Sequence, residues 1–160
     1  MTSQNAGWAE GMEWTMRYLN KHGLKKGSSF EVRVKYADDV EFKGKVGNKI
    51  DRKTDLQVCP NGPEVGGCTY FEFKSVKEVP PPNFNDQFVK DLLNDDVKDL
   101  SHIKWIFDGE KIKKADLEVL KNRIKTLDIP PTASAKFNLN TIDELKKEIE
   151  RNFDNIFQVQ

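Results

Sequence analysis

The stretch that decides the fold is TYFEFK, residues 69–74, in which aromatic and charged side chains alternate. Successive side chains of a strand point to opposite faces, so Phe71 and Phe73 share one face while Glu72 and Lys74 share the other. We expect the two phenylalanines to pack in a core. The charged pair must then be solvated in a cleft or paired with other groups, because burying it alone would be costly.

A shorter strand, DLQVC at residues 55–59, precedes this one across a turn rich in Gly and Pro. If the two strands form a hairpin, Asp55 lies within reach of Glu72, and two carboxylates converge with the ammonium of Lys74. Hard oxygen ligands of this kind suit Mg²⁺ or Mn²⁺. Asp51 is a rival acid, but it falls in a polar stretch, residues 47–54, that we expect to be a flexible loop.

Each of these residues also has a plain structural interpretation. Glu72 and Lys74 are also compatible with a solvent-facing ion pair, which contributes little to stability, although their order in the sequence favours the catalytic interpretation. Asp55 is also the kind of residue that accepts hydrogen bonds from turn amides at the start of a strand. A catalytic site is favoured only because Asp55, Glu72 and Lys74 occur together.

Two cysteines, Cys59 and Cys68, flank the turn between these strands. A local disulfide and a pair of reduced thiols both remain open. No second Cys or His pair stands at the spacing of a zinc finger, so we expect no zinc site.

Periodicity predicts the remaining elements. Helices are expected at residues 8–22, 84–94 and 114–127 and after residue 141; strands are expected at 29–36, 40–46 and 103–107. The first helix should bury the stripe Trp8, Met12, Met16 and Leu19. Asn83 and Thr141 are expected to cap helices, the latter in a capping box with Glu144. This order predicts a single α/β (α+β) domain, residues 1–160, with a central mixed β-sheet flanked by helices.

The composition limits the function. Lys and Arg number 26, as do Asp and Glu, so the formal net charge is zero. Neutrality counts against a general nucleic-acid-coating protein, but an enzyme with an acidic site remains compatible with it. The apolar runs are too short to span a bilayer, and the polar first residues do not resemble a signal peptide. We therefore expect a domain that acts in the cytoplasm, or a fragment delivered elsewhere.

The ordered set of a helical Glu, Asp55 and Glu72-x-Lys74 resembles the PD-(D/E)xK nuclease superfamily, the restriction-endonuclease-like fold. The resemblance covers about residues 8–90, with residues 91–160 as an extension. It implies that Asp55 and Glu72 bind a divalent metal ion and that Lys74 is the catalytic lysine. It also implies a catalytic carboxylate on the first helix, either Glu13 or Glu10.

One position departs from the superfamily pattern, because Thr54 stands where the eponymous proline would be. Downstream, residues 70–75, 85–88 and 103–107 are similar in layout to nuclease tips of bacterial polymorphic and contact-dependent growth inhibition toxins. This similarity implies Gln87 as an auxiliary residue, although an exposed helix position explains Gln87 as well. It also implies DNA or tRNA as the substrate, a cognate immunity protein as partner, and action in the cytoplasm of a target cell.

Two other classes remain open. The chain is also compatible with a non-catalytic module that binds nucleic acid or protein on the same fold, with its acids serving only structure. Alternatively, it is itself an interaction protein, such as an inhibitor of the immunity type, with its charged helices as the contact surface. Binding of a divalent metal ion distinguishes the nuclease from both.

Overall fold

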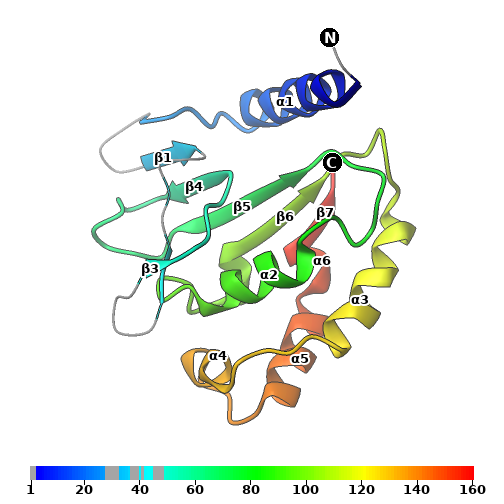
Figure 1. Cartoon of the computed structure of the whole chain (residues 1–160). Coiled ribbons are helices and arrows are strands. Elements are labelled where there is room, and N and C mark those ends of the chain that lie inside the picture. Colours follow the sequence, from blue (N-terminus) through cyan, green and yellow to red (C-terminus); the bar gives the residue numbers. More distant parts are fainter. Residues whose placement is uncertain (1–2, 28–32, 37–39, 41, 45–48) are drawn as a thin grey trace.

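The structure is a computed structural model that describes residues 3–27, 33–36, 40, 42–44 and 49–160. The first helix is followed by a run of strands and then by a mostly helical part of the chain (Figure 1). The helices and strands are α1 (Ser3–Lys21), β1 (Arg33–Tyr36), β2 (Phe42–Lys43), β3 (Lys49–Ile50), β4 (Leu56–Cys59), β5 (Thr69–Lys74), α2 (Phe84–Leu93), η2 (Leu100–His102), β6 (Ile103–Phe107), η3 (Lys114–Leu117), α3 (Glu118–Lys125), α4 (Pro131–Lys136), α5 (Ile142–Arg151), α6 (Phe153–Ile156) and β7 (Phe157–Val159).

A five-stranded sheet forms the centre, in the order β1-β4-β5-β6-β7. β4 is antiparallel to both β1 and β5, whereas β5, β6 and β7 run parallel. Parallel neighbours need a crossover connection, and α2 provides it between β5 and β6. A separate pair, β2 and β3, is antiparallel. The expected class, one α+β domain with a mixed sheet flanked by helices, is confirmed.

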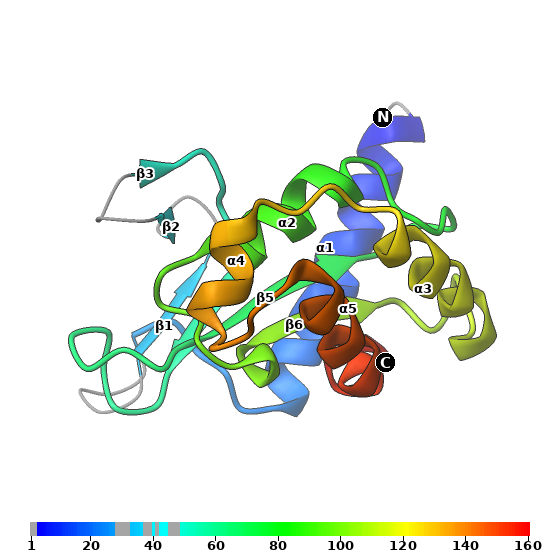
Figure 2. The ribbon, with the colours of Figure 1, turned by 90° about the horizontal axis from the view of Figure 1, so that it is seen from below.

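Each face of the sheet has its own apolar core (Figures 1 and 2). On one face, α1 packs through Trp14 and Tyr18 against Phe71 and Phe73. On the other face, the helices from α2 onward enclose Trp105 and other buried residues, among them Phe84, Phe88, Leu92, Phe107, Leu120, Leu145, Ile149 and Phe157. The alternation within residues 69–74 thus places Glu72 and Lys74 on the α2 side.

Most of the predicted elements are present. β5 and β6 have the predicted bounds, α2 ends one residue earlier, and the helix expected at 114–127 begins as the 3₁₀ turn η3. The Thr141 side chain accepts a hydrogen bond from the Glu144 amide, as expected of an N-cap. Cys59 and Cys68 form a disulfide, which decides between the two states that the sequence left open.

Three predictions are wrong. The buried stripe of α1 contains Leu19, as expected, but its other members are Trp14 and Tyr18, whereas Met12 and Met16 are 44% and 47% exposed. Asn83 has a left-handed backbone and makes no side-chain cap. The stretch 47–54 is not simply a flexible loop, because it contains β3 and two buried polar side chains, those of Arg52 and Thr54.

Two elements of the structure were not predicted from the sequence. The structure forms α4 and the edge strand β7, which the sequence pattern did not reveal. The predicted strand residues Phe30, Val32 and Val46, and the side chain of Trp8, lie outside the described part of the chain. No helix among the described residues is long and apolar enough to cross a membrane.

The corrected face of α1 can be tested by truncation. Trp14→Ala should lower the free energy of unfolding by about 3–5 kcal/mol, because it leaves a cavity against Phe73. Met12→Ala should change it by less than about 0.5 kcal/mol, because that side chain faces solvent. Urea unfolding of both variants measures the difference, and equal destabilisation would contradict the assigned face.

Candidate active site

Asp55 and Glu72 lie opposite each other on neighbouring chain segments. Leu56 pairs with Phe71 in the antiparallel register, so the preceding residue, Asp55, faces Glu72. The backbone fixes this position, because the Asp55 amide donates to the Phe71 carbonyl (3.1 Å) and the Asp55 carboxylate accepts from the Phe73 amide (2.8 Å). Thr54 donates a further hydrogen bond to the Phe71 carbonyl (2.6 Å). The hairpin predicted from the sequence therefore brings the two carboxylates together.

The proximity of the two acids changes the protonation of Asp55. Burial, and then the negative charge of Glu72, raise the pKa of the Asp55 carboxyl to about 7. The Phe73 amide, Lys74 and Arg52 act in the opposite direction but do not cancel these effects. Burial is the larger of the two effects, and the charge of Glu72 adds to it.

Glu72 is buried, at 5% exposure, and binds two cations. One carboxylate oxygen, Oε1, lies 3.2 Å from Lys74 Nζ, and the other, Oε2, accepts from Arg52 Nη2 at 3.0 Å. An unpaired carboxylate could not be buried at tolerable cost. The expectation that this charged pair must be solvated or paired is met by pairing.

Lys74 links the strand to α2. Its Nζ donates to Gln87 Oε1 at 3.0 Å and lies 5.5 Å from the centre of the Trp105 ring. Gln87 is half-buried and is therefore more than an exposed helix residue. We name Asp55, Glu72, Lys74 and Gln87 the carboxylate–lysine site.

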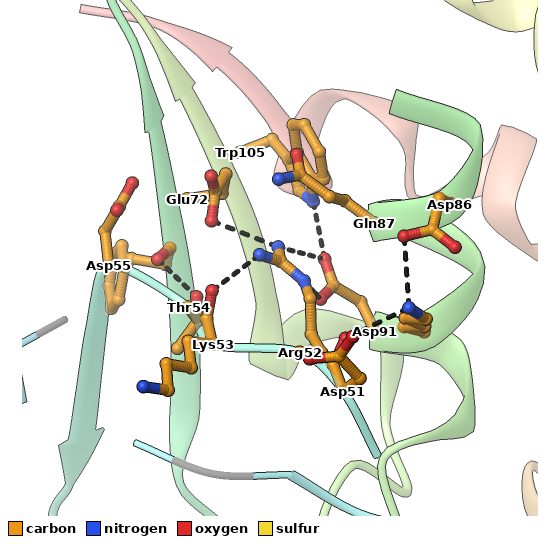
Figure 3. A network of polar contacts seen from close by, with 12 residues as sticks. Asp51, Arg52, Lys53, Thr54, Asp55, Glu72, Asp86, Gln87, Asp91 and Trp105 are labelled. Atoms are coloured by element: carbon orange, nitrogen blue, oxygen red, sulfur yellow. Dashed lines mark hydrogen bonds and ion pairs between the residues drawn. The ribbon is translucent and has the colours of Figure 1, made fainter. Parts of the chain in front are cut away.

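Arg52 and Asp91 were not anticipated from the sequence, yet they lie directly behind this site (Figure 3). Arg52 Nε donates to Asp91 Oδ1 at 3.0 Å, and Trp105 Nε1 donates to Asp91 Oδ2 at 2.9 Å. We name Arg52, Glu72, Asp91 and Trp105 the Arg52 network. Burial raises the pKa of Asp91 to about 6 against the opposing effect of Arg52, so this carboxyl is mostly ionised at neutral pH.

One sequence feature could have revealed Asp91. It stands seven residues after Phe84 and three after Phe88, which places it on the apolar face of the helix. An acid on a buried face requires a cationic or hydrogen-bonding partner. No comparable pattern marked Arg52, because its segment between β3 and β4 has no periodicity.

Glu13, one of the two carboxylates predicted on the first helix, is not brought to the site. Glu13 is exposed on α1, which packs on the sheet face opposite to Glu72. The side chain of Glu10 lies outside what the structure describes. The rival acid Asp51 is exposed, and its backbone carbonyl accepts from Lys90.

The donor set fits a hard divalent cation. Within the described part of the chain, no group of three or more His, Cys, Asp or Glu side chains is arranged to hold a metal ion. Asp55 and Glu72 supply two carboxylates, and Mg²⁺ commonly uses one or two together with water and substrate phosphate. Burial and the charge of Glu72 together raise the pKa of Asp55, and a cation there would offset the part that comes from Glu72.

No protein-family model matches the chain, and neither a curated protein nor a solved structure shows significant similarity to it. The assignment of the site therefore depends on its own geometry.

The raised pKa of Asp55 predicts a pH-dependent stability. In the unfolded chain an Asp has a pKa near 3.9, so between about pH 4 and pH 7 the folded state holds a proton that the unfolded state has lost. The free energy of unfolding should fall as the pH rises through this window, by at most about 4 kcal/mol. Asp55→Asn resembles the protonated acid and should lack this decline.

Urea unfolding at pH 5, 6, 7 and 8 provides the measurement. The stability of Asp55→Asn relative to wild type should increase steadily toward pH 8. Asp51→Asn, which removes an exposed neighbouring acid, is the control and should show no such trend. A constant difference between Asp55→Asn and wild type at every pH would show that the Asp55 pKa is not raised.

Proposed function

We propose that the protein is a metal-dependent nuclease that hydrolyses phosphodiester bonds at the carboxylate–lysine site. The observation that carries the proposal is the convergence of Asp55, just before β4, with Glu72 and Lys74 on β5, where burial and the charge of Glu72 raise the pKa of Asp55. These residues occur in the order that resembles the PD-(D/E)xK superfamily. The proximity of these residues in the fold is compatible with that order.

In this proposal some residues bind the metal ion and others stabilise charge on the substrate. Asp55 and Glu72 would hold Mg²⁺ or Mn²⁺, which supplies Lewis-acid polarisation of the scissile phosphate and an acidified water. Lys74 stabilises the negative charge that develops on the phosphate or orients the attacking water. Gln87 accepts a hydrogen bond from Lys74 Nζ and so holds the ammonium in position.

The proposed substrate is DNA or tRNA. In the setting implied by the toxin resemblance, this domain is the toxic tip of a bacterial competition toxin, delivered into the cytoplasm of a target cell and neutralised by a cognate immunity protein. A housekeeping nuclease would instead act in the cytoplasm of its own cell. Toxicity on expression in a bacterium, relieved by Glu72→Gln, distinguishes the first setting from the second.

One observation favours a second candidate, a non-catalytic binding module. Glu72 already contacts two cations, Arg52 and Lys74, which is what a purely structural ion network requires. In that case the Asp55 carboxylate serves only to accept a hydrogen bond from the Phe73 amide. The two candidates differ in whether a divalent cation binds and in whether nucleic acid is cut.

Cleavage assays test the proposed activity directly. Wild-type protein with Mg²⁺ or Mn²⁺ should cut plasmid DNA or total tRNA, and chelation should abolish cutting. Asp55→Asn, Glu72→Gln and Lys74→Met should each lower the rate at least about 100-fold, because each removes a charge used in the transition state. Glu78→Gln and Lys77→Met change exposed residues just beyond β5 and should cut at the wild-type rate. Equal cutting by the site variants and wild type would exclude this active site.

Metal binding can be measured without a substrate. A ligand that binds only the folded state at about 100 times its Kd stabilises it by about 2.7 kcal/mol. Mg²⁺ or Mn²⁺ should therefore raise the melting temperature of the chelator-treated wild-type protein but not that of Glu72→Gln. Glu78→Gln should respond like wild type. An unchanged melting temperature in wild type at millimolar metal would favour the binding module.

A further inference from the structure

Arg52 is buried in an unusual setting for an arginine. It lies between β3 and β4, outside any regular strand, and is 6% exposed. Its Nη1 donates to the Lys53 carbonyl at 2.7 Å, its Nε to Asp91 at 3.0 Å, and its Nη2 to Glu72 at 3.0 Å. Each nitrogen of the guanidinium therefore has an acceptor, and the planar group has a single orientation.

Asp91 determines that orientation. It is 4% exposed on α2 and accepts hydrogen bonds from Arg52 and from the indole of Trp105, which is fully buried on β6. The network thus connects α2, the sheet and the segment before β4 through buried, hydrogen-bonded side chains (Figure 3). A shift of Asp91 would be transmitted to Glu72 through the guanidinium.

Stability alone does not explain a buried pair of this kind. Replacing a buried ion pair with apolar residues is often neutral or stabilising, because desolvation offsets the attraction between the charges. Neutralising Glu72 would need only a nearby positive charge, which Lys74 already supplies at 3.2 Å. Asp91 accepts from Arg52 Nε at 3.0 Å and from Nη2 at 3.5 Å, so one carboxylate faces two guanidinium nitrogens and fixes the direction of the group.

We propose that Arg52, oriented by Asp91, is a positioning residue that fixes the carboxylate of Glu72 for metal binding. Arg52 engages Oε2, which sets the rotamer of Glu72 and leaves Oε1 beside Lys74. This inference rests on the proposed nuclease function and assigns a role to residues outside the carboxylate–lysine site. Partners that orient a metal-binding carboxylate typically change metal affinity or activity 10–100-fold when they are substituted.

Arg52→Lys separates positioning from simple charge compensation. Lysine keeps the positive charge but lacks the planar fork that binds Asp91 and Glu72 together. We expect the Mn²⁺ dissociation constant and the cleavage rate kcat each to worsen about 10–100-fold, with KM for nucleic acid changed by less than about threefold. Arg123→Lys, at an arginine on α3 that donates to Asn85, is the matched control and should behave as wild type.

The measurements are Mn²⁺ titration by electron paramagnetic resonance, cleavage kinetics and thermal unfolding on the same preparations. If Arg52→Lys does not fold, Asp91→Asn takes its place, because it keeps the shape of the side chain and removes its charge. A folded variant with wild-type Mn²⁺ affinity and kcat would overturn the positioning role. Loss of folding in both variants would also overturn it, because the network would then serve structure. If wild type neither binds Mn²⁺ nor cleaves, the nuclease function itself fails, and this inference fails with it.

Discussion

The buried carboxylate of Glu72 is the constraint on which the centre of this structure depends. It points from the middle of β5 toward α2, where water is largely excluded. The negative charge of a carboxylate there must be compensated, and Arg52 and Lys74 each pair with one of its two oxygens. Arg52 in turn requires Asp91, and Asp91 requires the indole of Trp105. One charge on a strand therefore determines the side chains of three other elements.

The same constraint gives the site its chemical character. Two cations and three carboxylates lie in or behind one hairpin, and the Arg52–Asp91 pair largely cancels within itself. Burial, and then the negative charge of Glu72, raise the pKa of Asp55, and Lys74 opposes them only in part. An excess of negative charge held on rigid backbone is a suitable environment for a divalent cation.

Short-range patterns predicted much of this arrangement from the sequence. Alternation in residues 69–74 placed Glu72 and Lys74 on one face, and the hairpin placed Asp55 opposite Glu72. Short-range patterns gave the wrong buried residues where contacts between distant parts of the sequence determine burial. Met12 and Met16 fit a helical stripe, but the aromatic pair Trp14 and Tyr18 buries more surface against the phenylalanines of β5.

The missed residues have the same explanation. Arg52 lies in a segment without periodicity, so only its tertiary partners reveal that it is buried. Glu13 matched a position in a pattern, yet α1 covers the other face of the sheet. The edge strand β7 has three residues and pairs with β6 across a long stretch of helices, a contact that no local pattern specifies.

Diffraction from crystals soaked in Mn²⁺ tests the central claim most directly, because the anomalous signal locates the ion without reference to activity. We predict one strong anomalous peak within about 2.0–2.3 Å of carboxylate oxygens of both Asp55 and Glu72. The peak should disappear in Glu72→Gln crystals. The absence of a peak in wild type, with Arg52 and Lys74 still on Glu72, would contradict the metal site and leave a structural ion network in its place.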